Sequence, residues 1–292
     1  MDWQFFVGTL PLASMYFLLG LSFVLIYRTS RVVNFAAGEL AVLAPYLLLA
    51  LPQLGIAFLP GLALASWLMV GLVGACLFLV GLRAMTGQSP VPAILATFAA
   101  AIVLRAIIEL VWTSQPKFIL AGLGVRLAPV RWGPIEGLTW ADIGVVPAAA
   151  LVALAIAALL RFSVLGVRTR AVAESQELAG HRGVNVYATL GGAWLLAAIA
   201  AGIAGTYYAL AVRLSPSVAV YGLRALTVPL LGGLDSVWGA LLASLAVALV
   251  ERASVRFGDP LLGDVAPFAL LLAALWIRPW GLFGRPEQVE RV

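Results

Sequence analysis

Long apolar segments separated by short polar connections make up most of the chain. They run over roughly 4–27, 34–52, 56–82, 91–113, 141–160, 187–211, 225–250 and 264–277. A helix needs about 20 apolar residues to cross the hydrocarbon core of a bilayer, where each backbone polar group must be bonded within the protein. The pattern therefore predicts an all-α, polytopic integral membrane protein with about eight transmembrane helices.

Two of these segments carry residues that interrupt helices. Pro45 is expected to interrupt the second segment, and Pro229 with Gly232 and Gly233 the seventh. Glycine and proline both lower helix stability relative to alanine, and irregular backbone at membrane depth is tolerated only against protein or a wet cavity. We therefore expect at least one broken or re-entrant helix, with a discontinuity between 225 and 237 that faces the bundle interior.

Composition agrees with a membrane-embedded chain. Hydrophobic residues make up 63% of the sequence and charged residues 11%, and the mean hydropathy is +1.06. A soluble domain has about half apolar and a quarter charged residues. The start of the chain lacks the basic region of a signal peptide, so the first segment is expected to be retained. We expect a single transmembrane domain over 1–292, with a polar loop at about 161–186.

The formal net charge of the chain is +5. We interpret its arginines as residues that flank the membrane rather than as a nucleic-acid-binding face. Basic residues concentrate on the cytoplasmic side of membrane proteins, which favours an external N-terminus. The cytoplasmic set is then Arg28, Arg31, Arg83, Arg161, Arg168, Arg170 and Arg182, and the external set is Lys117, Arg126, Arg131, Arg213 and Arg224. If residues 216–236 re-enter, the tail with Arg278, Arg285 and Arg291 is also internal.

Histidine, cysteine and lysine, which many catalytic and metal sites use, each occur only once in the sequence. The chain has one histidine, His181, and one cysteine, Cys76, whereas a metal site needs several converging ligands. Its only lysine, Lys117, is followed by Phe118, so no phosphate-binding Gly-Lys-Ser/Thr loop exists. We predict that the chain is not an enzyme, has no catalytic residue, metal site or cofactor, and depends on another chain for any ATP hydrolysis.

Few ionisable residues fall inside the apolar segments. Glu39 opens the second segment, where free N–H groups of a first helical turn would stabilise it or where it would line a transport path. Arg105 and Glu109 are four residues apart, so we expect them to pair with each other or with another polar partner. The sixth segment repeats small residues that permit close helix packing, at Ala198, Ala201, Gly202 and Gly205.

The polar loop is predicted to contain a short helix over 170–179, which Gly180 and Gly183 would terminate. Such a helix fits docking to a soluble partner, but it fits equally a solvated connector lying on the headgroups. The residues alone leave these alternatives open.

Four motifs in order resemble those of the LivH-type permeases of branched-chain amino acid ABC importers. Asn34–Glu39 resembles the family's Asn-Phe-Ala-His-Gly-Glu, with Ala37 in place of the histidine. Arg170–Ala173 followed by Gly183–Val186 resembles its cytoplasmic loop. Leu231–Ala240 resembles its Gly-Gly-Leu-Gly-Ser segment, and Arg278–Gly284 its C-terminal signature.

The resemblance implies a permease in the plasma (inner) membrane of a prokaryote, working with a LivM-like sister permease, two cytoplasmic ATPases and an extracytoplasmic solute-binding protein. It also implies that the polar loop is the ATPase coupling loop. The candidate coupling residues are Arg170, Glu174, Glu177, Leu178, Gly183 and Asn185, and the exposed face is expected to include Glu174, Glu177 and either Leu178 or Val172.

Helix breaks near the bilayer midplane expose backbone groups and half-helix ends, so we expect the substrate path beside the two interrupted segments. The candidate path residues are Asn34, Gly38, Glu39, Gly232, Gly233 and Ser236. The main alternative is a stand-alone secondary transporter or channel for a small polar solute such as urea or an amide. It would need more titratable groups inside the spans than this sequence offers. A further alternative is a membrane scaffold that transports nothing.

Overall fold

The computed structural model describes residues 3–54, 59–86, 90–124, 130–132, 135–211 and 213–284. Predictions that concern Arg126, Arg285 and Arg291 lie outside the described residues. The α-helices are α1 (Trp3–Ser30), α2 (Ala37–Ala50), α3 (Leu59–Cys76), α4 (Pro90–Trp112), α5 (Ile119–Gly122), α6 (Trp140–Phe162), α7 (Val164–Glu174), α8 (Gln176–His181), α9 (Val186–Ala211), α10 (Val220–Ala225), α11 (Thr227–Gly232), α12 (Val237–Phe257) and α13 (Leu262–Ile277).

Shorter elements complete the described part of the chain. Helix α3 continues into a π-helical stretch, η2 (Leu77–Leu82), and 3₁₀ turns are formed by η1 (Leu51–Leu54), η3 (Arg83–Met85) and η4 (Pro216–Ala219). Strands β1 (Val130–Trp132) and β2 (Ile135–Leu138) pair as an antiparallel hairpin.

Six of the described helices are long and apolar enough to cross a membrane: α1, α3 with its extension, α4, α6, α9 and α12. Helices α2 and α13 are apolar but shorter. These elements correspond to the eight apolar segments, and the predicted all-α, polytopic membrane fold is confirmed.

Helix α9 lies at the centre of the bundle and packs against α1, α2 and α3. Its predicted small-residue face is buried, and the glycines there touch neighbouring backbone. A Cβ atom added to Gly205 would lie 1.9 Å from the carbonyl oxygen of Ala41 in α2, and one added to Gly74 in α3 would lie 2.5 Å from Cβ of Ala198. The small residues therefore set the close spacing between α9 and its neighbours.

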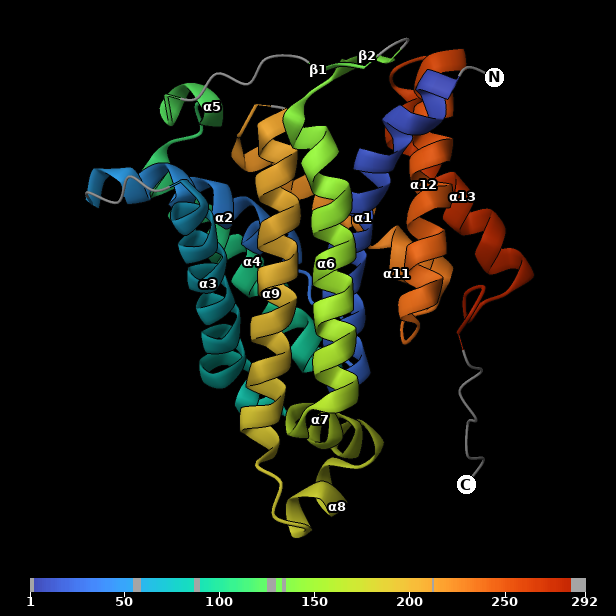
Figure 1. Cartoon of the computed structure of the whole chain (residues 1–292). Coiled ribbons are helices and arrows are strands. Elements are labelled where there is room, and N and C mark those ends of the chain that lie inside the picture. The colour runs from blue at the N-terminus through green and yellow to red at the C-terminus, as the bar shows by residue number, and fades with distance from the viewer. Residues whose placement is uncertain are drawn as a thin grey trace.

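The two ends of the bundle differ in structure (Figure 1). The N-terminus, α5 and the β1–β2 hairpin lie at one end, and α7 and α8 extend beyond the helices at the other. Lys117 pairs with Leu214 as an isolated β-bridge near α5. From there η4, α10 and α11 run into the bundle as three short pieces before α12 begins (Figure 1).

Both segments that were predicted to be interrupted contain irregular backbone, but only one of them at the predicted position. The discontinuity predicted between 225 and 237 is confirmed, because α11 ends at Gly232, α12 starts at Val237, and Gly232 and Gly233 are buried. The interruption predicted at Pro45 is wrong, since α2 continues through this residue. The irregular backbone lies before α2 instead, over residues 31–36, where Arg31 has a positive φ of 56°.

Candidate functional site

The non-helical stretch before α2 is held by side chains that replace missing helical hydrogen bonds. The Asn34 side-chain oxygen accepts from the N–H of Ala36 at 3.0 Å. The Phe35 N–H donates to the Thr97 hydroxyl of α4 at 3.1 Å. The side-chain nitrogen of Asn34 is buried and has no hydrogen-bond partner among the described residues. This stretch therefore combines a fixed backbone with an unused donor inside the bundle.

The start of α2 meets α10 through direct contact of two glycines. A Cβ atom added to Gly222 would lie 2.3 Å from Cα of Gly38, and one added to Gly38 would lie 2.4 Å from the carbonyl oxygen of Ala219. No side chain fits at either position, so the backbone at the start of α2 touches the backbone of η4 and α10. Gly38 was a predicted path residue, whereas its partner Gly222 could not be predicted, because a single glycine next to Tyr221 matches no pattern that indicates a close contact.

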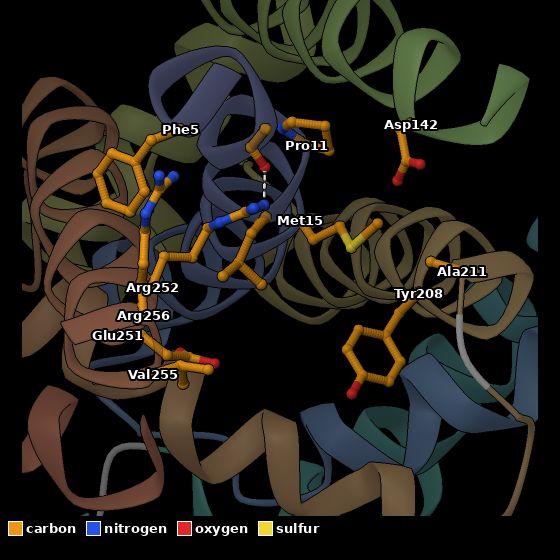
Figure 2. Close-up of a pocket in the computed structure, with 12 residues that line it drawn as sticks. Phe5, Pro11, Met15, Asp142, Tyr208, Ala211, Glu251, Arg252, Val255 and Arg256 are labelled. Carbon is orange, nitrogen blue, oxygen red and sulfur yellow. Dashed lines mark hydrogen bonds between the residues drawn. The ribbon is translucent and has the colours of Figure 1, made fainter. Parts of the chain in front are cut away.

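A cavity of about 580 Å³ lies among α1, α6, α9 and α12, toward the end of the bundle that holds the N-terminus. Figure 2 shows Glu251, Arg252 and Arg256 of α12 on one side of it and Asp142 and Tyr208 on the other. We call it the wide cavity.

Below the wide cavity is a much smaller one of about 20 Å³, which we call the narrow pocket. The two share Leu12, Met15 and Tyr208 as lining residues, and the narrow pocket reaches Gly38 and Gly222. The open space thus tapers from the N-terminal end of the bundle to the glycine contact. Asn34 and Glu39, two other predicted path residues, line neither space.

An ionic network that the sequence analysis missed connects four elements beside these cavities. Arg224 of α10 forms ion pairs with Asp264 of α13 at 2.7 Å and with Glu251 of α12 at 3.9 Å. Glu251 also accepts a 2.5 Å hydrogen bond from the Tyr16 hydroxyl of α1. A signal for this network was present in the sequence, since Glu251 directly follows the predicted seventh segment, which ended at 250. In the structure the helix continues through Glu251 to Phe257.

Glu39 occupies the first turn of α2, as predicted, but its ionic partner differs from the predicted pair. Arg105 of α4 contacts Glu39 Oε1 through Nε at 2.9 Å and through Nη2 at 2.7 Å. The prediction that Arg105 pairs with Glu109 or with another polar partner is thus confirmed for Arg105, whose partner is Glu39 rather than Glu109. Glu109 is exposed, and an arginine that precedes a glutamate at i, i+4 is the less favourable order, whereas buried Glu39 needs a cation much more strongly.

We expect Arg105→Leu to destabilise the protein more than Glu39→Gln. The first change leaves a carboxylate that is 5% exposed without its cation, and the second leaves an arginine side chain that is 42% exposed. Breaking a buried pair costs about 3–5 kcal/mol, and the partial exposure of Arg105 places this pair at or below the lower end. Thermal unfolding in detergent measures the effect, with Glu109→Gln as the control that should change nothing. Equal melting of all three variants would contradict the assigned pair.

The turn between α11 and α12 brings two of the sequence motifs together. Gly233 has φ of +109°, and the Ser236 hydroxyl caps α12 by accepting from the N–H of Gly239 at 2.9 Å. The tail returns to this turn: Leu282 N–H donates to the Leu231 carbonyl at 2.8 Å, and Phe283 N–H donates to the Gly232 carbonyl at 3.1 Å. The C-terminal signature thus terminates α11, a contact that the separate motifs did not reveal.

The polar loop consists of two helices, where the sequence predicted one over 170–179. Helix α7 begins earlier, at Val164, and Ser175 separates it from α8 by capping the N–H of Leu178 at 3.2 Å. Gly180 lies inside α8, and Gly183, with φ of +80°, is the residue that ends it. Asn185 then accepts from the N–H of Ala188 at 3.0 Å at the start of α9.

The exposed face of this loop matches the expectation. Glu174 and Glu177 are exposed, Leu178 is 66% exposed, and Val172 is buried against the bundle. Arg170 is exposed and donates to the Leu160 carbonyl at the end of α6 at 2.5 Å. An apolar side chain with acidic neighbours is therefore exposed on this loop, whose helices lie at one end of the bundle (Figure 1).

Comparison with known proteins places the chain among transport permeases. It is 27% identical to the high-affinity branched-chain amino acid transport system permease protein LivH of Escherichia coli K12, covering 99% of this chain and 97% of that protein. It is 28% identical to the corresponding protein BraD of Pseudomonas aeruginosa, with the same coverage. A probable LivH of Methanocaldococcus jannaschii is 26% identical over 95% of this chain and 91% of its own length.

No solved structure matches the chain significantly. The family model described as branched-chain amino acid transport system / permease component matches residues 5–275. This match spans every described membrane helix from α1 almost to the end of α13. The chain belongs to the family of branched-chain amino acid transport system permease components.

Proposed function

We propose that the chain is the membrane-embedded permease subunit of an ABC importer for branched-chain amino acids. It acts in the plasma (inner) membrane of a prokaryote, together with a sister permease, two cytoplasmic ATPases and an extracytoplasmic solute-binding protein. The observation that carries the proposal is the tapering space that ends at the Gly38–Gly222 contact, in a chain of this family.

The substrate path in this proposal follows the two interrupted segments. Backbone groups that helices would otherwise use become available where α2 begins and where α10 and α11 are broken. Asn34 and Glu39 line neither cavity, but each keeps one buried polar atom without a partner among the described residues. In this proposal a polar solute meets these atoms only after the glycine contact has opened. Gly232, Gly233 and Ser236 belong to the turn between α11 and α12, and in this proposal the turn moves together with α10 and α11.

Transport in this proposal is by alternating access. The wide cavity lies toward the end of the bundle opposite to α7 and α8, and the glycine contact borders the narrow pocket next to it. ATP-driven closure of the ATPases would push on α7 and α8, and the helices attached to them would tilt as packed units. Separation of α10 from the start of α2 would then open the path inward.

The loop of α7 and α8 is proposed as the ATPase coupling element. Arg170 ties α7 to the end of α6, while Gly183 and Asn185 fix the start of α9, so a push on the loop reaches both spans. Glu174, Glu177 and Leu178 are exposed and free to enter a cleft on the ATPase. A partly apolar anchor with charged neighbours is typical of an interface hot spot.

Uptake into proteoliposomes tests the proposed function. The chain is reconstituted with its sister permease and ATPases, with binding protein outside and ATP inside, and labelled leucine, isoleucine, valine, urea and acetamide are compared. We expect saturable uptake of the three amino acids that requires ATP. Uptake by this chain alone, driven by an ion gradient without ATP, would support the secondary transporter, whose coupling groups would be Glu251 and Tyr16 in the ionic network.

In the same assay, Glu177→Arg combined with Leu178→Asp is expected to reduce uptake to background and to release the ATPases on purification. The variant places charge into a contact where a single anchor contributes about 2 kcal/mol or more, while both positions are exposed and leave the fold intact. The matched control, Ser114→Asp with Gln115→Arg, adds the same side chains to exposed positions on the connection that follows α4. Normal uptake with ATPases bound would show that the loop is only a connector.

A further inference from the structure

A groove of about 670 Å³ lies between α1, α6 and α12. Ser236 and Arg170 line it, but it shares no lining residue with the wide cavity or the narrow pocket. One wall is formed by α6, where alanines at 150, 153 and 157 leave a furrow on the helix surface. Leu154 on this wall is 68% exposed, and Trp238 on the α12 wall is 75% exposed. In a membrane protein, such an open apolar groove is covered either by the acyl chains of lipid or by another transmembrane subunit.

Three arginines line the groove together with these apolar residues. Arg28 lies near the end of α1, Arg161 near the end of α6, and Arg170 is fastened to the Leu160 carbonyl of the same α6 terminus. All three side chains belong to exposed residues. The charges of Arg161 and Arg170 are thus held at one place, the end of the bundle from which α7 and α8 project (Figure 1).

Carboxylates of the described chain do not neutralise this cluster. None of the ion pairs among the described residues includes Arg28, Arg161 or Arg170. Asp235 is the one carboxylate among the groove-lining residues, so three positive charges face a single negative one. Bringing like charges together is unfavourable without a counter-charge. A ligand that fits this lining therefore has a negative charge next to the arginines and an apolar part next to the alanines of α6.

We propose that this groove binds an anionic phospholipid. The phosphate lies among the guanidinium groups of Arg28, Arg161 and Arg170, which bind phosphate oxygens in a planar, bidentate geometry. One acyl chain lies in the furrow of α6, against Ala153, Leu154 and Ala157. Basic pockets between transmembrane helices on the cytoplasmic side bind anionic headgroups in the same manner.

The position of Trp238 agrees with this occupant. Tryptophan is enriched at the level of the headgroups, where its ring is apolar and its N–H remains wet. Trp238 is in the first turn of α12, on the groove wall that also carries Asp235. The groove therefore has a charged end, an interfacial aromatic and an apolar furrow, which is the order of parts in a phospholipid.

Native mass spectrometry of the complex purified from membranes tests the proposal. The complex is delipidated, incubated with equal amounts of phosphatidylglycerol and phosphatidylcholine of the same acyl chains, and scored for lipid retained. We expect the wild type to retain phosphatidylglycerol preferentially. We expect Arg28→Gln with Arg161→Gln to lower that retention by roughly twenty-five-fold, since each basic residue near an anionic surface contributes about a factor of five.

The matched control is Arg168→Gln with Arg182→Gln, which removes the same charge from exposed positions of α7 and the end of α8 without lining the groove. It should retain phosphatidylglycerol as the wild type does. A second variant, Ala157→Phe, fills the furrow and keeps all three arginines, so it should lower retention of both lipids. This variant tests the site even if the arginine variant folds poorly.

Three results would overturn the proposal. The first two are equal retention of the two lipids by the wild type and undiminished retention of phosphatidylglycerol in both groove variants. The third is occupation of the groove by protein: in a Cys76→Ser background, Leu154→Cys would then cross-link to the sister subunit in high yield. Reaction of Leu154→Cys with a lipid-soluble maleimide, without such a cross-link, is the expected result.

Discussion

Gly38→Ala and Gly222→Ala are each expected to abolish ATP-dependent uptake, although both replace glycine by the smallest side chain. The added methyl at 222 would lie 2.3 Å from Cα of Gly38, and the one at 38 would lie 2.4 Å from the Ala219 carbonyl oxygen. Real Cβ atoms do not approach backbone this closely, so α10 must move away from the start of α2. Overpacking of this kind costs typically 1–3 kcal/mol, and here it opens the contact that closes the narrow pocket.

The matched control is Gly192→Ala in α9. Its new methyl would lie 3.5 Å from a methyl of Leu165, which is ordinary contact, and alanine is the better helix former. This variant should transport and melt as the wild type does. Uptake and thermal unfolding are measured together, because loss of uptake in a folded Gly38→Ala protein assigns the contact to transport. Wild-type uptake by both Gly38→Ala and Gly222→Ala would show that this contact is not part of the transport path.

The helices themselves could be predicted from the sequence because apolar length directly determines which segments span a membrane. The break at Gly232 and Gly233 was also predictable, since two adjacent glycines weaken any helix. Pro45 was misleading for a physical reason. A proline inside a membrane helix loses one hydrogen bond and can be tolerated when neighbouring helices pack against it, and Pro45 is buried in α2.

Partners across the bundle could not be predicted, because a single sequence carries no information about which helices are neighbours. Arg105 had an acidic residue at the correct spacing on its own helix, yet the structure pairs it with Glu39, 66 residues away. The network of Arg224, Glu251 and Tyr16 likewise joins three elements that are distant in sequence. The sequence pattern shows only that a charged residue lies in an apolar segment. Because burying an unpaired charge there is costly, the pattern indicates that a partner exists, but it does not identify the partner.

The C-terminal signature offers the second large effect, because its backbone completes the end of α11. The carbonyls of Leu231 and Gly232 belong to buried residues, and their hydrogen-bond donors are the N–H groups of Leu282 and Phe283. Gly281, with φ of +79°, makes this return possible. Removing a partner from a buried backbone group costs about 1–3 kcal/mol for each group, so loss of the signature should cost several kcal/mol in total.

Deletion of residues 280–292 is therefore expected to leave a protein with much reduced thermal stability and no measurable uptake, whereas deletion of 285–292 alone should preserve both. The two truncations differ only in residues 280–284, which contain both donors and Gly281. A finer variant, Gly281→Val, places its side chain in an unfavourable backbone region and 2.8 Å from the nitrogen of Gly233, so it should reproduce the longer deletion at full chain length. If 280–292 can be removed without loss of stability or uptake, water must satisfy the α11 carbonyls, and the signature has no part in holding the broken helix in place.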